Sequence, residues 1–147
     1  MPVATRRDRS ALRGYHRMGW SGEERRDAMK AVRGDEVTQE QGSTFTGETR
    51  LMRLLGAQQP GGIAVSLVHF EDGSRTHWHV HPGEQVLYVL DGQGRVGTAE
   101  EEIIVGPGDV VYAAPMERHW HGAAPGQSMT HFSVTNVGPP EWFEAPE

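Results

Sequence analysis

The sequence predicts an all-β protein, a sandwich or barrel that occupies the chain from about residue 44 onward. Short runs rich in β-branched and aromatic residues follow one another there, as is typical of strands. The turn sequences EDGS, HPGE, DGQG and PGD separate these runs. No helical pattern intervenes between them, and many short strands with close turns are characteristic of sandwiches and barrels.

Eight runs are the candidate strands, and side chains along each are expected to alternate between two faces. In chain order they are residues 43–55 (STFTGETRLMRLL), 62–71 (GIAVSLVHFE), 75–81 (RTHWHVH), 85–91 (QVLYVLD), 94–99 (GRVGTA), 101–105 (EEIIV), 109–115 (DVVYAAP) and 129–136 (MTHFSVTN). Six apolar residues are predicted to line a pocket or to belong to the core: Met52, Leu54, Val65, Leu67, Leu87 and Tyr112.

The segment that precedes the strands lacks their pattern of short β-type runs separated by turns. Residues 1–43 are predicted to form an N-terminal arm ahead of a barrel that spans residues 44–147. Within the arm, Ser21 and Glu24 match an S-x-x-E capping box. This box predicts a short helix over about residues 21–33.

Composition limits the classes of protein to which the chain can belong. Its 147 residues suit one domain, and the absence of cysteine excludes disulfides, thiolate metal sites and a cysteine nucleophile. No stretch approaches the roughly 20 apolar residues of a membrane span, and no signal-peptide hydrophobic region is present. We therefore expect a soluble, cytoplasmic protein that has no membrane partner.

The net charge of −6 is unevenly distributed. Residues 1–34 carry nine Lys/Arg against four Asp/Glu, a net charge of +5, whereas residues 35–147 carry five against sixteen, a net charge of −11. The acidic part would repel phosphate, so no nucleic-acid partner is expected. The basic arm is predicted to be solvated or to fold onto the acidic part or a sister subunit. Exposed edge strands favour pairing between copies, which predicts a homodimer.

Histidine is concentrated in the predicted barrel, which holds seven of the eight in the chain. His77, His79 and His81 alternate along one run and would point to the same face. His119 and His121 repeat the arrangement around a tryptophan. Because neutral imidazole is the commonest ligand of divalent metals, convergence of these two segments predicts a metal site.

The first histidine segment resembles a motif of the cupins, a family of small metal-binding β-barrels. This motif reads G-x5-H-x-H-x3/4-E-x6-G, and it is matched in spacing throughout by Gly73, His79, His81, Gln85 and Gly92. Glutamine stands where glutamate is usual. The resemblance implies the double-stranded β-helix, or jelly-roll, barrel of that family.

The second cupin motif, G-x5-P-x-G-x2-H-x3-N, is matched in part. Gly108 and His119 occupy its glycine and histidine positions. Ala114, Met116 and Ala123 replace its proline, second glycine and asparagine. These departures affect the turn before His119 but leave the ligand position itself in place.

Three stretches resemble a narrower group of single-domain cupins, which includes bacterial manganese hydroxynitrile lyases and carboxymuconolactone-decarboxylase-associated cupins. The stretches are RTHWHVHPGEQ, GDVVYAAPMERHWHGAAP and SMTHFSV. The resemblance implies four metal ligands, namely His79, His81, Gln85 and His119. It also implies that His131 is a catalytic acid/base and that His121 lines the same cavity. The expected cofactor is one divalent metal, Mn²⁺ or Fe²⁺ first, with Ni²⁺, Zn²⁺, Co²⁺ or Cu²⁺ as alternatives.

A rival register pairs His77 and His79 with Glu84, which also fits H-x-H-x4-E. Neither flanking glycine of the motif fits that register. A slip of one residue turns every side chain of a strand to the other face, so only one of Glu84 and Gln85 can point inward. We favour Gln85 and expect Glu84 to face solvent.

The choice of an amide has a chemical consequence. Three neutral imidazoles and a neutral amide leave the full 2+ charge on the metal, which makes it a stronger Lewis acid. We therefore expect a metal-dependent enzyme for a small organic substrate, either a lyase of hydroxynitrile type, a decarboxylase or an isomerase, in which His131 or His121 moves a proton. The alternatives are a cupin dioxygenase and a non-catalytic metal- or ligand-binding cupin.

Overall fold

The computed structural model describes residues 29–147, whose compact unit begins at residue 32. A single turn of 3-10 helix at Gly34–Glu36 precedes the strands. The strands are β1 (Gln39–Glu40), β2 (Thr49–Leu55), β3 (Ala64–Phe70), β4 (His79–Val80), β5 (Gln85–Gly92), β6 (Gly94–Gly97), β7 (Glu102–Val105), β8 (Val110–Ala113), β9 (Trp120–Ala123), β10 (Met129–Thr135) and β11 (Glu141–Trp142).

The predicted all-β class is confirmed, since the described residues contain no α-helix. Each of the eight predicted runs contains one strand. Three further strands, β1, β9 and β11, lie outside those runs. No helix in the described part of the chain is long and apolar enough to cross a membrane.

The helix predicted over about residues 21–33 lies mostly outside the described residues. Its last positions, 29–33, are described and are not helical. These positions are exposed, so no packing holds an apolar face there, and short helices depend on such packing. Strand β1 falls inside the predicted arm and pairs with β2, so the sheet begins before residue 44.

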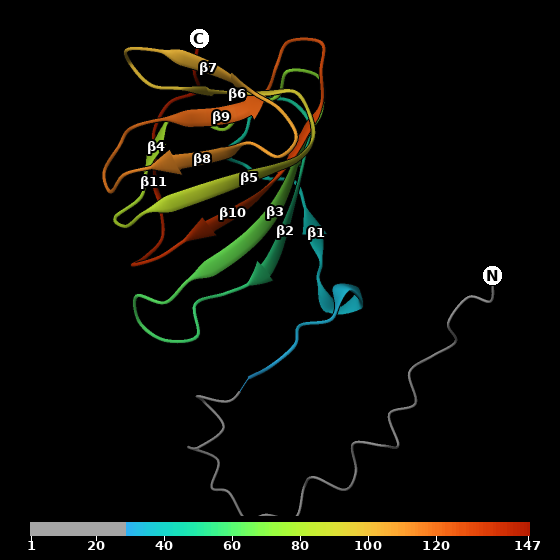
Figure 1. The fold of residues 1–147 in the computed structure, drawn as a ribbon, viewed down its shortest axis with the longest axis vertical. Coiled ribbons are helices and arrows are strands. Elements are labelled where there is room, and N and C mark those ends of the chain that lie inside the picture. The colour runs from blue at the N-terminus through green and yellow to red at the C-terminus, as the bar shows by residue number, and fades with distance from the viewer. Residues whose placement is uncertain (1–28) are drawn as a thin grey trace, which may run out of the picture. The chain divides into compact units, whose positions relative to one another are not determined.

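The strands form two larger antiparallel sheets and a small third one (Figure 1). The larger sheet has the order β1-β2-β3-β10-β5-β8, and β7-β6-β9 form a second sheet. Strand β11 pairs with β4. The two histidine segments are joined directly, because the backbone amides of His79 and His119 each donate to the other's carbonyl, at 2.9 and 3.0 Å.

The hydrophobic core lies between the six-stranded and three-stranded sheets, because its residues come from both. Its buried members are Leu51, Val68, Phe70, Val89, Val96, Val105, Ala123 and Met129. Of the six apolar residues predicted for the pocket or core, Leu87 is buried. The other five alternate with inward-facing residues of β2, β3 and β8 and lie on the outer face of the sheet. The outer face is also apolar, so alternation alone did not distinguish the two sides.

Glycines of the two cupin motifs stand where the chain needs a left-handed backbone. Gly73, Gly92 and Gly108 have φ angles of 70°, 81° and 88°. At Gly92 a Cβ would also come within 2.0 Å of the Ser128 carbonyl oxygen, so only glycine fits there without a shift of the backbone.

Candidate metal centre

Three buried imidazoles converge at one end of the space between the sheets. His79 lies on β4, His81 follows that strand, and His119 immediately precedes β9. One ring nitrogen of each lies within 4.8 Å of the others, and their side chains are 1%, 5% and 2% exposed. This group could hold a divalent metal ion, and its members are three of the four ligands that the sequence predicted.

Backbone carbonyls orient two of these rings. The Nδ1–H of His79 donates to the carbonyl of His77 at 2.9 Å, and the Nδ1–H of His119 donates to that of Glu117 at 2.8 Å. In a neutral ring this tautomer leaves Nε2 with a free lone pair, the form that binds a metal. His77 therefore contributes its backbone to the site, whereas its half-buried side chain lies outside the three-histidine group.

Burial keeps the three imidazoles neutral. Burial is the main cause and the nearby His119 the second, and together they lower the pKa of His79 to about 3. The pKa of His81 falls to about 4, again mainly through burial, and that of His119 is also lowered by burial. Neutral rings are available to a metal at ordinary pH without first losing a proton.

Gln85 completes the group from β5, where its side chain is 3% exposed. Its Nε2–H donates to Ser133 Oγ at 2.9 Å, which turns Oε1 toward His119 Nε2 at 2.8 Å. Because the His119 proton is inferred to sit on Nδ1, this contact brings two lone pairs face to face. A shared cation would stabilise that arrangement.

The remaining ring supports the same interpretation. Both ring nitrogens of His81 are buried and have no hydrogen-bond partner, a costly state unless one of them binds a ligand. Three imidazoles and one amide oxygen therefore suit a divalent transition metal, although this donor set does not choose among such metals.

Glu84 lies on the opposite side of the strand from Gln85. Its exposed carboxylate accepts a hydrogen bond from the Tyr112 hydroxyl at 2.7 Å. Leu87 and Val89 share the buried face with Gln85, at 3% and 1% exposure. The structure therefore brings the amide, and not the carboxylate, to the imidazoles.

A second histidine pair adjoins the three-histidine group. His131 on β10 and His121 on β9 are 0% and 4% exposed, and His131 Nε2 lies 3.0 Å from His121 Nδ1. One of these nitrogens donates and the other accepts. The outer nitrogens, His121 Nε2 and His131 Nδ1, are buried without a partner. Burial lowers the pKa of His131 to about 4 and lowers that of His121 well below its usual value.

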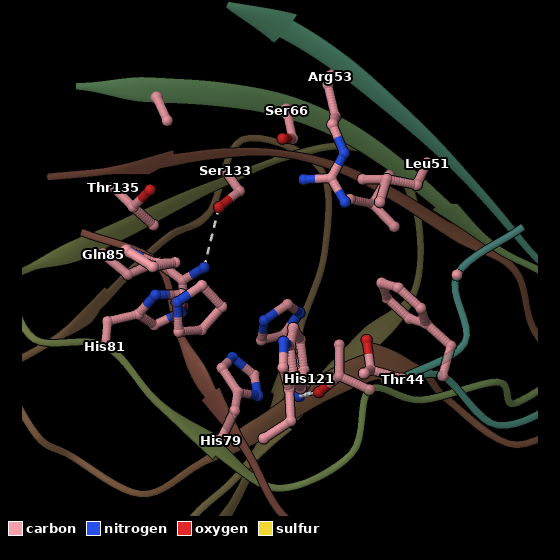
Figure 2. Close-up of a pocket in the computed structure, with 18 of the residues that line it drawn as sticks. Thr44, Leu51, Arg53, Ser66, His79, His81, Gln85, His121, Ser133 and Thr135 are labelled. Carbon is pink, nitrogen blue, oxygen red and sulfur yellow. Dashed lines mark hydrogen bonds between the residues drawn. The ribbon is translucent and has the colours of Figure 1, made fainter. Parts of the chain in front are cut away.

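These side chains open onto one cavity of about 750 Å³ (Figure 2). Its histidine side is lined by His79, His81, Gln85, His121 and His131. Its other walls include Phe45, Leu51, Val68, Ser66, Ser133 and Thr135. Arg53 also lines the cavity, and its Nε–H donates to Glu40 Oε1 at 2.9 Å. The cavity suits a small organic molecule that has apolar groups and groups able to hydrogen-bond to hydroxyls.

Trp142 is a cavity residue that sequence reasoning missed. It lies on β11, and its ring centroid is 4.4 Å from that of His79. Because β11 pairs with β4, the C-terminal segment covers the ring of a candidate ligand. A strand of two residues carries no alternation to reveal it, and the apolar pair Trp142 and Phe143 was the only available signal.

Known proteins share this architecture. A family model described as a cupin domain matches residues 66–135. An (R)-mandelonitrile lyase from Granulicella tundricola is 50% identical over 93 residues, which cover 61% of this chain and 70% of the relative.

Solved structures agree with these matches. A cupin-like protein from Thermotoga maritima superposes with a TM-score of 0.66 at 37% identity, covering 72% of this chain and 87% of the other. The polyketide cyclase RemF from Streptomyces resistomycificus has a TM-score of 0.66 at 22% identity, covering 82% and 89%, and shares the fold. With both histidine segments and the motif glycines in their expected places, the chain belongs to the cupin family.

Proposed function

We propose that this cupin is a divalent-metal-dependent lyase of hydroxynitrile type, which uses Mn²⁺ or Fe²⁺ and cleaves a small cyanohydrin into a carbonyl compound and hydrogen cyanide. One observation carries the proposal. Four neutral donors, from His79, His81, Gln85 and His119, meet beside a buried pair of neutral histidines, and all of these residues except His119 line one cavity. The relative named as an (R)-mandelonitrile lyase supports the choice of reaction.

The four donors would hold the metal, which supplies Lewis acidity to the hydroxyl oxygen of the substrate when it is bound. All four donors are neutral, so no ligand charge offsets the charge of the metal. This favours Lewis-acid chemistry over oxidation to a trivalent state, which anionic ligands would support.

The histidine pair provides a place for the proton. In the neutral pair one of the two unpartnered nitrogens, His121 Nε2 or His131 Nδ1, has a lone pair that can accept the hydroxyl proton, and the other carries a hydrogen. The 3.0 Å contact between the rings lets the pair share the added proton. As the O–H electrons form the carbonyl, the C–C bond breaks and its electron pair leaves with cyanide. The imidazolium then returns the proton to cyanide. The lowered pKa of both rings keeps them unprotonated and able to act as a base.

The proposal is tested by loading the chelator-treated protein with one metal at a time. Each form is assayed for aldehyde release from mandelonitrile and aliphatic cyanohydrins, while dissolved oxygen is monitored. We expect turnover with Mn²⁺ or Fe²⁺ and no oxygen uptake. His79→Ala should abolish metal content, and His131→Gln should lower kcat by about 10²-fold or more while metal content is retained.

Two results would replace this function with another. Oxygen consumption coupled to substrate loss would identify a dioxygenase. Binding of small ligands without turnover in any metal form, unchanged by His131→Gln, would identify a non-catalytic binding protein. If His79→Ala still binds a full equivalent of metal, the metal site is not the one proposed.

A further inference from the structure

Arg53 brings a positive charge to the wall of the cavity. Among the described residues that line the cavity, it is the one with a cationic side chain, since burial keeps the histidines neutral. It lies on β2, where alternation turns it to the inner face together with the buried Leu51. Figure 2 shows the side chain extending from that strand into the cavity, across from the histidines. The outer face, where a charge is more easily hydrated, is occupied by Met52 and Leu54 instead.

The guanidinium of Arg53 has donors to spare. Its Nε–H donates to Glu40 Oε1 at 2.9 Å, and within residues 29–147 its side chain makes no other hydrogen bond or ion pair. Both partners are exposed, and an exposed ion pair of this kind contributes little to stability. The two terminal NH₂ groups can therefore bind an anion in the cavity, in the two-pronged geometry that guanidinium forms with carboxylates.

A row of hydroxyl groups leads from Arg53 to the metal centre. Ser66 is the cross-strand partner of Arg53, and Ser133 is the partner of Ser66. Ser133 Oγ in turn accepts the Gln85 amide at 2.9 Å. Neighbouring strands are about 4.8 Å apart, so about 10 Å separates the backbone of Arg53 from that of Ser133. A molecule with one ring or a short chain can span the gap between the metal centre and the guanidinium.

The charge around the cavity gives this arginine its importance. Residues 35–147 carry a net charge of −11, which would repel an anionic substrate from most of the surface. Within the cavity wall, Arg53 balances Glu40. A bound divalent metal would add two positive charges that its neutral ligands leave uncompensated. The metal-loaded cavity is therefore a positive region in an acidic protein, and it favours an anion.

We propose that the substrate carries a carboxylate, which Arg53 binds together with the Ser66 hydroxyl while the metal centre and the histidine pair act on the other end. The substrate class is then a cyanohydrin whose carboxylate lies across a ring or short chain from the carbinol carbon. This class rests on the proposed lyase function, whereas the anion site rests on the cavity wall alone. Binding of a remote group holds the reacting end in one orientation and so contributes to kcat/KM.

The test is the binding of two aldehydes of the same shape to the full-length, manganese-loaded protein, measured by isothermal titration. Para-formylbenzoate is charged and para-formylbenzamide is neutral, and neither can turn over without cyanide. We expect the wild type to bind the carboxylate about 10-fold more tightly, the effect of a hydrogen bond to a charged group. Arg53→Met keeps the apolar stem and should reduce this preference to within about two-fold, the level of a lost surface charge contact. Arg53→Lys should retain part of the preference.

Two further variants serve as controls. Arg50 lies on the same strand and pairs with Glu71, but it does not line the cavity. Arg50→Met should leave the preference unchanged, and an equal loss there would overturn the proposal, because general surface charge would then attract the anion. Glu40→Gln removes the competing carboxylate and should tighten the binding of para-formylbenzoate, while that of para-formylbenzamide stays the same. Metal content should be equal in all these variants.

Turnover of the matching cyanohydrins separates this inference from the lyase function. In the wild type kcat/KM should be higher for para-carboxymandelonitrile than for para-carbamoylmandelonitrile, and in Arg53→Met the two values should be equal. Equal turnover and equal aldehyde affinities in the wild type would overturn the carboxylate substrate and leave the lyase function standing. A charge preference that persists in Arg53→Met would also overturn it, because the carboxylate would then bind the metal. An Arg53-dependent preference without turnover of any cyanohydrin would support the anion site and reject the lyase function.

Discussion

The orientation of the Gln85 amide depends on a single neighbour. Ser133 Oγ accepts the amide N–H at 2.9 Å and leaves Oε1 pointing to the histidines. Without that bond the amide can rotate and present nitrogen, which cannot bind a metal. Ser133→Ala should therefore weaken Mn²⁺ binding by about 3- to 10-fold, the effect of one neutral hydrogen bond. Isothermal titration of the metal-free protein measures this directly.

The control for that substitution lies on the neighbouring strand. Ser66 is the cross-strand partner of Ser133 and lines the same cavity, but the Gln85 amide donates to Ser133 and not to Ser66. Ser66→Ala should leave metal affinity unchanged. In a Gln85→Ala background, Ser133→Ala should have no further effect. An equal loss in that background would show that Ser133 acts on the fold and not on the amide.

The same titration of metal binding tests which of the adjacent residues Glu84 and Gln85 is the metal ligand. Gln85 is buried beside His119, whereas the Glu84 carboxylate accepts a bond from Tyr112 at the surface. Gln85→Ala should lower metal affinity markedly, and Glu84→Ala should leave it within about two-fold, as expected for a surface change. The reverse pattern would restore the rival register, with His77 as a ligand.

The turn before His119 contains a replaced motif glycine. Met116 stands there with φ of 63°, a left-handed conformation that costs a residue with a side chain about 1–2 kcal/mol. Its backbone N–H donates to the His81 carbonyl at 2.8 Å, so the turn contacts the metal centre.

Met116→Gly should raise the free energy of unfolding by a net of about 0.5–1 kcal/mol, because relief of the left-handed strain exceeds the extra chain entropy that glycine loses. Denaturant unfolding measures the change. Met116→Ala retains a Cβ and should bring no such increase. A loss of stability in Met116→Gly would mean that the exposed methionine side chain makes a contact worth more than the strain.

Sequence patterns identified strands where turn chemistry bounded them. Eight runs each contain a strand because glycine-rich turns mark their ends. Strands β1 and β11 have only two residues each, too few for an alternating pattern of apolar and polar residues to be recognised. Strand β9 has the sequence WHGA and is buried on both sides. Its glycine and alanine are not typical strand residues, so the sequence did not indicate a strand there.

The same limits apply to the candidate site. Motif spacing predicted which residues would meet, since it reflects the local geometry of two segments. It could not predict the contact between His121 and His131, because these residues lie on β9 and β10, which belong to different sheets. The motif position of Gln85 predicted which face of β5 points inward, since Leu87 and Val89 share that face. For β2, β3 and β8, which carry no such motif residue, the inward face could not be predicted, because both faces carry the same residue types.

The stability of the whole barrel depends on keeping buried imidazoles neutral. His131 has a pKa of about 4 in the folded protein, lowered mainly by burial, against 6.5 in the unfolded chain. Between those values the unfolded state binds more protons, so the free energy of unfolding must fall as the pH falls from about 6.5 to about 4. His131 alone contributes about 3 kcal/mol to this fall, and the neighbouring His121, whose pKa is also lowered, adds to it.

Urea unfolding of the chelator-treated protein at a series of pH values tests this linkage. His131→Gln removes one of the titrating groups, so its stability should fall less steeply than that of the wild type, by up to about 1.4 kcal/mol per pH unit within that window. Surface carboxylates titrate in both proteins and cancel in the difference between the two curves. Parallel curves from pH 6.5 to 4 would mean that His131 is protonated in the folded state, and its assignment as a neutral base beside the metal centre would fail.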